Sequence, residues 1–220
     1  MSPKPYGRWP GILRATQFGN VCPQESGGAV IGSENCLFLN VYAPHAREEH
    51  GPLLPVMVWI HGSGLIAESG EIFDPSPLVE QGKVIVVTIN YRLGPPGFFA
   101  HPAIDNEGHP RGNYGLLDQQ FALKWVRQNI LGFGGNNRLV TIFGQSAGGL
   151  SAYCHLASPT AAGLVQRAIA ESGSYAGFTD YLGEIATSRS GGNGWHAFRS
   201  VGSRSCHGRR MSEPTCEMPA

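Results

Sequence analysis

One serine in this sequence lies in a turn pattern that is typical of a catalytic nucleophile. It is Ser146, at the centre of the G-x-S-x-G segment 144–148. An apolar β-type run, 140–143, precedes the segment, and a helical stretch of small residues, 150–157, follows it. Such a turn exposes the serine Oγ near a helix N-terminus, where the amide of Ala147 can face a developing oxyanion. The pattern predicts attack by Ser146 on a carbonyl carbon, and the alternative is a glycine-rich loop before a helix.

Apolar runs and helical periods alternate along the rest of the chain. Strands are expected at 36–42, 55–60, 84–89, 140–143 and 167–172. Helices are expected at 74–81, 114–130 and 150–157, with a short helical turn at 161–166. Residues 1–32 are interpreted as loop, and 90–113 as a long loop that contains four prolines. This order predicts an α/β fold with a mostly parallel central sheet flanked by helices.

Charge and composition narrow the class of partner. The 220 residues contain 16 Lys and Arg and 16 Asp and Glu, so the formal net charge is zero. Since the basic residues are also scattered, we expect neither nucleic acid nor a membrane as partner. No His, Cys or Asp cluster has ligand spacing, so no metal or cofactor is expected.

The composition changes after residue 176. Ser, Gly, Arg and Cys dominate, and the few apolar residues have no period. Such a segment cannot bury enough surface to offset its ordering entropy. We therefore predict one domain over 1–176 and an irregular tail over 177–220 that is disordered or translated in a shifted frame.

Seven sequence blocks, in order, resemble one known family. Together they resemble the type-B carboxylesterases of the α/β-hydrolase fold, which include cholinesterases and para-nitrobenzyl esterases, and the bacterial branch is the most similar. The resemblance spans about 16–173 and implies a partial α/β-hydrolase fold. It also implies a serine carboxylic-ester hydrolase that forms an acyl-enzyme with a small-molecule ester and needs no cofactor. The blocks are 33–41, 59–64, 90–94, 112–120, 133–135, 144–148 and 167–173.

The resemblance assigns roles to individual residues. Ser146 would be the acyl-accepting nucleophile, and the amides of Ser63, Gly64 and Ala147 would form the oxyanion hole. Ser172 matches a serine that lies near the catalytic histidine without touching the substrate.

Two cysteines bear on the compartment. Cys22 and Cys36 flank a glycine-rich loop and could be either disulfide-bonded or reduced on the sequence alone. The resemblance matches them to the family's first disulfide, which favours a secreted or periplasmic protein. The N-terminus shows no signal-peptide core, and a cytoplasmic location stays open.

Three residues depart from the family pattern. Gln145 replaces a glutamate, which keeps the size but removes a charge that we expect to be buried. Asn35 replaces an aspartate that could pair with Arg92. Ser63 replaces a glycine, and if that position requires a positive φ, a serine there costs about 1 kcal/mol.

The acid and histidine of the triad have no convincing candidate. In the family that the chain resembles they would lie beyond residue 220, so a truncated or frameshifted product is one hypothesis. Asp180 or Glu184 followed by His196 or His207 has the required order but lacks the family's surroundings. We expect His61 to orient the neighbouring loop and His155 to be a structural residue. The competing interpretation is a non-catalytic binding or adhesion-type member, or an inert fragment, of the same fold.

Overall fold

The computed structural model describes residues 3–5, 7, 10, 11, 13–45, 51–99 and 112–173. The predicted tail, 177–220, lies outside the described residues. The alternative triad candidates Asp180, Glu184, His196 and His207 lie outside them as well.

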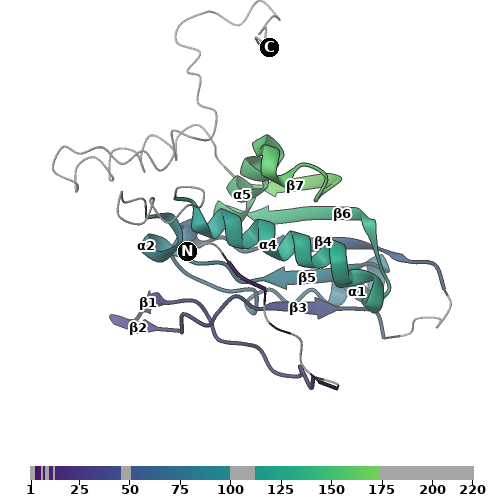
Figure 1. Ribbon diagram of the computed structural model, residues 1–220, viewed down its shortest axis with the longest axis horizontal. Coiled ribbons are helices and arrows are strands. Elements are labelled where there is room, and N and C mark those ends of the chain that lie inside the picture. The colour runs from purple at the N-terminus through teal and green to yellow at the C-terminus, as the bar shows by residue number, and fades with distance from the viewer. Residues whose placement is uncertain are drawn as a thin grey trace, which may run out of the picture.

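The core of the fold is a five-stranded sheet with the strand order β3-β5-β4-β6-β7 (Figure 1). The parallel strands are β4 (Leu54–Ile60), β5 (Ile85–Ile89), β6 (Gly135–Gln145) and β7 (Arg167–Glu171). At one edge, β3 (Leu39–Tyr42) pairs antiparallel with β5. The predicted mostly parallel sheet is therefore confirmed, with one antiparallel edge strand.

Helices cover both faces of this sheet. On one face, α4 (Tyr114–Asn129) and α5 (Ala147–Ala157) bury Leu123, Val126 and Ala152 against the strands. On the other face, α1 (Ser76–Gly82) packs Val79 against β5 and β6. Figure 1 shows α4 crossing the front of the sheet. All five residues of β5 are buried, because this strand has a strand on each side and a covered surface on each face.

Two segments that were predicted to be loop contain secondary structure. A two-stranded hairpin, β1 (Gln24–Ser26) and β2 (Ala29–Ile31), lies in the first 32 residues. Its turn residues Gly27 and Gly28 have φ of 60° and 83°, which is the glycine-dependent geometry of a tight hairpin. Each strand has only three largely exposed residues, so no hydrophobic period announces them. In the long loop, α2 (Gly94–Phe98) has two prolines in its first turn.

Four short segments complete the described structure. Three of them are the 3₁₀ turns η1 (Ser63–Leu65), η2 (Ile130–Phe133) and η3 (Pro159–Ala161). The fourth is a hydrogen-bonded turn after Ala161, which lies where the helical turn 161–166 is predicted. Within the described part of the chain, no helix is long and apolar enough to cross a membrane.

The disulfide between Cys22 and Cys36 is present. The two Cα atoms are 4.8 Å apart, and the bond closes a loop over a sequence separation of 14. Both side chains belong to the main core cluster, so the disulfide anchors the N-terminal segment to the sheet. The prediction from the resemblance is confirmed.

We expect removal of this disulfide to lower the free energy of unfolding by about 3 kcal/mol, because the unfolded chain then regains the entropy of the open loop. Urea denaturation of the C22S/C36S variant measures the change. Dithiothreitol should destabilise the wild type and leave the double-serine variant unaffected. Equal stability of the oxidised wild type and the variant would contradict the prediction.

Candidate active site

Ser146 lies in a strained turn between β6 and α5. Its backbone has φ 57° and ψ −120°, a conformation that non-glycine residues rarely adopt. The Ser146 amide donates to the carbonyl of Glu171 at 2.8 Å, and its carbonyl accepts from the Leu150 amide at 3.0 Å. Hydrogen bonds to β7 and to α5 thus stabilise the strained residue, and the predicted strand-turn-helix geometry is present.

The two glycines of the turn allow a close approach of three elements. A Cβ on Gly144 would lie 2.5 Å from the Ile60 carbonyl oxygen and 2.6 Å from the carbonyl carbon of Gly148. A Cβ on Gly148 would also collide with the Ile60 oxygen. These contacts involve backbone atoms, which cannot move aside as a side chain can.

We expect the G144A variant to unfold at lower urea concentration, with a loss of about 3 kcal/mol, because the new methyl group must separate β6 from β4 or α5. Gly132 offers a matched control, since a Cβ there meets no atom within 4 Å. Urea unfolding of G144A and G132A should therefore differ, and equal midpoints would show that the turn is not tightly packed.

The segment after β4 runs directly beside this turn. A Cβ on Gly62 would lie 3.3 Å from the Ser146 Cβ and 2.7 Å from the Gln145 carbonyl oxygen. In η1, which follows, Ser63 and Gly64 have φ of 55° and 63°. Within the described residues, neither of their amides donates to another backbone group. The structure therefore brings the predicted oxyanion segment next to the predicted nucleophile.

Ala147 completes the predicted set of amide donors. It is the first residue of α5, where a backbone amide has no intrahelical acceptor. The helix dipole also places partial positive charge at this end of α5. Free amides from η1 and from the start of α5 thus lie around Ser146, an arrangement that can bind a negatively charged oxygen.

Neither His61 nor His155 is placed to take the proton of the Ser146 hydroxyl within the described residues. The ring of His61 is 1% exposed and stacks on Tyr91 with a centroid distance of 4.3 Å. Burial lowers the pKa of His61 to about 4, although the Gly62 backbone opposes this shift, and neither ring nitrogen makes a hydrogen bond within the described residues. The Ser146 hydroxyl makes no hydrogen bond within the described part of the chain. His61 is therefore packed where it shapes the adjacent loop.

His155 is a packed structural residue in α5. It is 2% exposed, and its Nε2 lies 2.7 Å from Oε1 of Gln119 in α4. The Gln119 amide donates in turn to the Ser151 hydroxyl at 3.2 Å. Burial lowers the pKa of His155 to about 4, so the imidazole is neutral near pH 7.

Gln145 and Ser172 occupy the ends of the two strands beside the turn. Gln145 is exposed, contrary to the expected burial, and it is the last residue of β6. Ser172 follows β7 with φ 51° and is also exposed. It adjoins Glu171, whose carbonyl holds the Ser146 amide, so both residues lie close to the turn.

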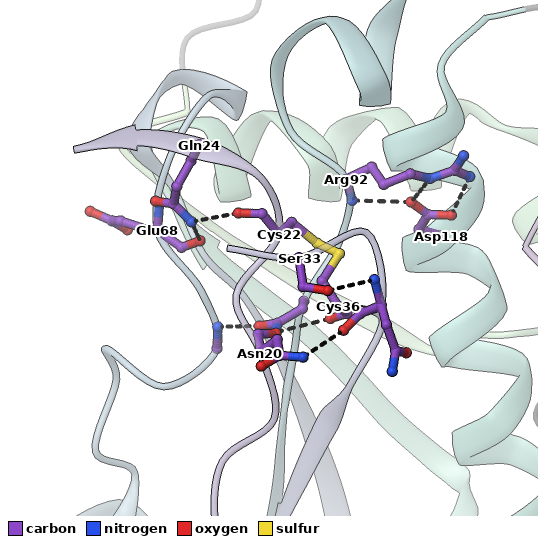
Figure 2. Close-up of a disulfide and its surroundings, with 11 residues drawn as sticks. Asn20, Cys22, Gln24, Ser33, Cys36, Glu68, Arg92 and Asp118 are labelled. Carbon is purple, nitrogen blue, oxygen red and sulfur yellow. Dashed lines mark hydrogen bonds and ion pairs between the residues drawn. A yellow bond between two sulfur atoms is a disulfide. The ribbon is translucent and has the colours of Figure 1, made fainter. Parts of the chain in front are cut away.

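Asn35 lacks the carboxylate that an aspartate could offer to Arg92, and in the structure another residue supplies one. Asn35 is exposed, whereas Arg92 forms a two-point ion pair with Asp118 of α4 (Figure 2). Nε and Nη2 of Arg92 each donate to a different carboxylate oxygen at 2.7 Å, and the Arg92 amide donates to Oδ2 at 3.0 Å. Burial raises the pKa of Asp118 and the contacts with Arg92 oppose that rise. The segment after β5 is therefore tied to α4.

Asn90 and Tyr91 also support the site, although the sequence alone assigns them no role. The Asn90 side chain accepts from the Gly70 amide at 2.8 Å and donates to the Cys36 carbonyl at 3.1 Å. The Tyr91 hydroxyl donates to the His61 carbonyl at 2.9 Å. Their place directly after a buried strand could have indicated this role, because buried polar side chains must find hydrogen-bond partners.

No group of three or more His, Cys, Asp or Glu side chains within the described ranges could hold a metal ion.

Comparisons with known proteins agree with this geometry. A family model described as the carboxylesterase family matches residues 1–180. The para-nitrobenzyl esterase of Bacillus subtilis (strain 168) is 49% identical over 181 residues, and the cocaine esterase of Oryctolagus cuniculus is 45% identical over 184. The alignments cover 78% and 77% of this chain. A solved structure of a PNB esterase superimposes with a TM-score of 0.71 at 49% identity and covers 79% of this chain.

The chain spans only about a third of the length of these relatives. The alignments cover 36% of the Bacillus subtilis protein, 34% of the rabbit protein and 36% of the solved PNB esterase chain. Over that part, the sheet order, the turn at Ser146 and the disulfide fit the predicted α/β-hydrolase fold. On the match of sequence and fold, the chain belongs to the carboxylesterase family.

Proposed function

We propose that the protein hydrolyses carboxylic esters through an acyl-enzyme on Ser146. The observation that carries the proposal is the strained Ser146, with φ 57°, at the N-terminus of α5 and beside the amides of η1. A strained backbone that hydrogen bonds from two elements hold in place is a feature that concentrates at functional sites.

The proposed reaction uses the groups around Ser146 in two steps. The Ser146 Oγ attacks the ester carbonyl, and the amides of Ser63, Gly64 and Ala147 donate to the oxygen that becomes negative. Collapse of this intermediate forms the acyl-enzyme and expels the alkoxide, which takes up the proton that the base removed from Ser146 and leaves as the alcohol. Water then attacks the acyl carbon, releases the carboxylic acid and restores the Ser146 hydroxyl.

Attack by Ser146 needs a base within hydrogen-bond reach. Since His61 and His155 are buried in packing contacts, we propose that the base and the acid that orients it come from outside the described residues. Residues 1–176 would then form the nucleophile and oxyanion part of the catalytic domain, and the match of the family model to 1–180 supports this division.

The names of the relatives suggest the class of substrate. They include a para-nitrobenzyl esterase and a cocaine esterase, which supports small-molecule carboxylic esters as substrates of this protein. The Cys22–Cys36 disulfide supports folding in an oxidising compartment, such as outside the cell or in a periplasm.

A fluorophosphonate probe tests the role of Ser146 directly, because it phosphonylates only an activated serine hydroxyl. We expect mass spectrometry to find the adduct on Ser146 in the folded chain and no adduct in the S146A variant. Removal of the base in well-studied serine hydrolases costs about 10⁶ in kcat, so slow modification is expected wherever the base is absent.

External imidazole makes this test more specific. If the turn and the oxyanion amides are competent but a base is lacking, imidazole should accelerate the modification of Ser146 in proportion to its concentration. Denatured chain is the control and should show no acceleration. A folded chain that the probe does not modify, even with imidazole, would overturn the proposal and favour a binding or adhesion role.

A further inference from the structure

The oxyanion segment contains two residues that hold each other in strained conformations. Ser63 has φ 55° and Glu68 has φ 80°, both in the left-handed region where a non-glycine residue costs about 1 kcal/mol. The Ser63 hydroxyl donates to Oε1 of Glu68 at 2.7 Å. A hydrogen bond to a carboxylate is roughly twice as strong as one between neutral groups, so this contact can offset the strain.

Glu68 is itself tied to the segment that the disulfide closes. Its amide donates to Oε1 of Gln24 at 2.7 Å, and Nε2 of Gln24 donates back to the Glu68 carbonyl at 3.1 Å. The same Nε2 lies 3.1 Å from the carbonyl oxygen of Cys22. Figure 2 shows Gln24 between Glu68 and the disulfide. Contacts therefore run from Cys22 through Gln24 and Glu68 to Ser63.

The opposite end of the segment is held in another way. The Tyr91 hydroxyl donates to the His61 carbonyl, and the two rings stack. Between these ends, little packs around Gly64, since a Cβ there would meet only Ile66, at 3.8 Å. The orientation of the Ser63 and Gly64 amides therefore depends on the hydrogen bonds at the ends of the segment together with the packing of Leu65, which is buried in the main core cluster.

We propose that Glu68 is a positioning residue of the oxyanion hole, which it holds through the Ser63 hydroxyl while Gln24 anchors it to the disulfide-closed loop. The inference rests on the proposed function, in which the Ser63 and Gly64 amides stabilise the oxyanion. It also explains how a serine is accommodated at a position with a positive φ, because the side chain that Ser63 adds provides the hydrogen bond to Glu68.

The first test measures the turn without reference to activity. The Ile66 amide donates to the Ser63 carbonyl at 3.1 Å, so its exchange with water reports whether the turn is formed. In NMR exchange experiments on the full chain, we expect E68A and S63A each to accelerate this exchange about tenfold. The double variant S63A/E68A should exchange as fast as either single variant, since both remove one and the same contact.

Two further variants separate positioning from general destabilisation. E68Q keeps an acceptor for the Ser63 hydroxyl and should restore exchange to within about twofold of the wild type. E71A removes an exposed carboxylate three residues away and should leave the exchange unchanged. Equal exchange in E68A and E71A, or strictly additive effects of S63A and E68A, would overturn the proposal.

The second test concerns the reaction itself. With a fluorophosphonate in the presence of imidazole, E68A should lower the maximal rate of Ser146 modification about tenfold, with the half-saturating probe concentration unchanged, because only the charged intermediate uses the amides. Rates that match the wild type would overturn the role of Glu68. If wild-type Ser146 is not modified at all, the proposed hydrolysis fails, and the exchange of Ile66 alone decides whether Glu68 holds the turn.

Discussion

Replacement of Asp118 by alanine is expected to lower the free energy of unfolding by about 4 kcal/mol, which corresponds to a fall of roughly 10 °C in the melting temperature. The side chain of Asp118 is fully buried, and that of Arg92 is 20% exposed. Without the carboxylate, the guanidinium and the Arg92 amide lose the three hydrogen bonds that they donate to Asp118. Removal of one member of a buried ion pair costs more than the intact pair contributes.

Two variants check this explanation by calorimetry and urea denaturation. D118N keeps one acceptor oxygen and should lose less stability than D118A. The double variant R92M/D118L removes both charges and should recover most of the loss, because apolar side chains of similar volume can replace a buried pair. If D118A is as stable as the wild type, the pair does not tie the segment after β5 to α4.

Acidification is expected to destabilise the fold steeply between about pH 6.5 and pH 4. His61 and His155 are buried, and burial lowers the pKa of each from its ordinary value of 6.5 to about 4. In this window the unfolded chain binds protons that the folded chain excludes, so stability is complete above pH 6.5 and decreases as the pH falls. The difference corresponds to about 3 kcal/mol for each histidine at pH 4.

A comparison of pH profiles isolates the histidines from the other groups that titrate in this range. Urea unfolding at several pH values should give a slope for the H155L variant that is about half as steep as the wild-type slope. Absolute stability will also change, because Oε1 of Gln119 loses its contact with the His155 ring, but that loss does not depend on pH. Parallel profiles for the wild type and H155L would show that His155 is not the source of the acid sensitivity.

The elements of the fold could largely be predicted from the sequence. The apolar runs that predicted strands at 55–60, 84–89 and 140–143 coincide with β4, β5 and β6, and β6 extends further at both ends. Burial on both faces makes such runs continuous, which is why they are easy to recognise. The β1–β2 hairpin was missed because its few exposed residues carry no period and depend instead on the turn glycines and on contacts of Gln24.

The partners of individual polar side chains could not be predicted in the same way. The sequence indicates that Asn35 lacks a carboxylate that could pair with Arg92, but it does not indicate that the carboxylate is Asp118, 26 residues away along the chain. Gln145 is expected to be buried and is exposed. Glu68, to which the sequence assigns no role, contacts Ser63. The Arg92–Asp118 contact joins separate elements, and the Ser63–Glu68 contact closes the loop after β4, so both follow from the way that loops pack over strand ends.

The sequence by itself determined the nature of the turn at Ser146, because glycines at 144 and 148 between a strand and a helix permit little else. It also determined the family, through many short blocks in one order. The tertiary structure decided that the η1 amides lie beside Ser146 and that Glu68 and Tyr91 hold the two ends of their segment. Hydrogen bonds between residues far apart in sequence exist only once the sheet has aligned the ends of β4, β5 and β6, and that alignment is a property of the whole fold.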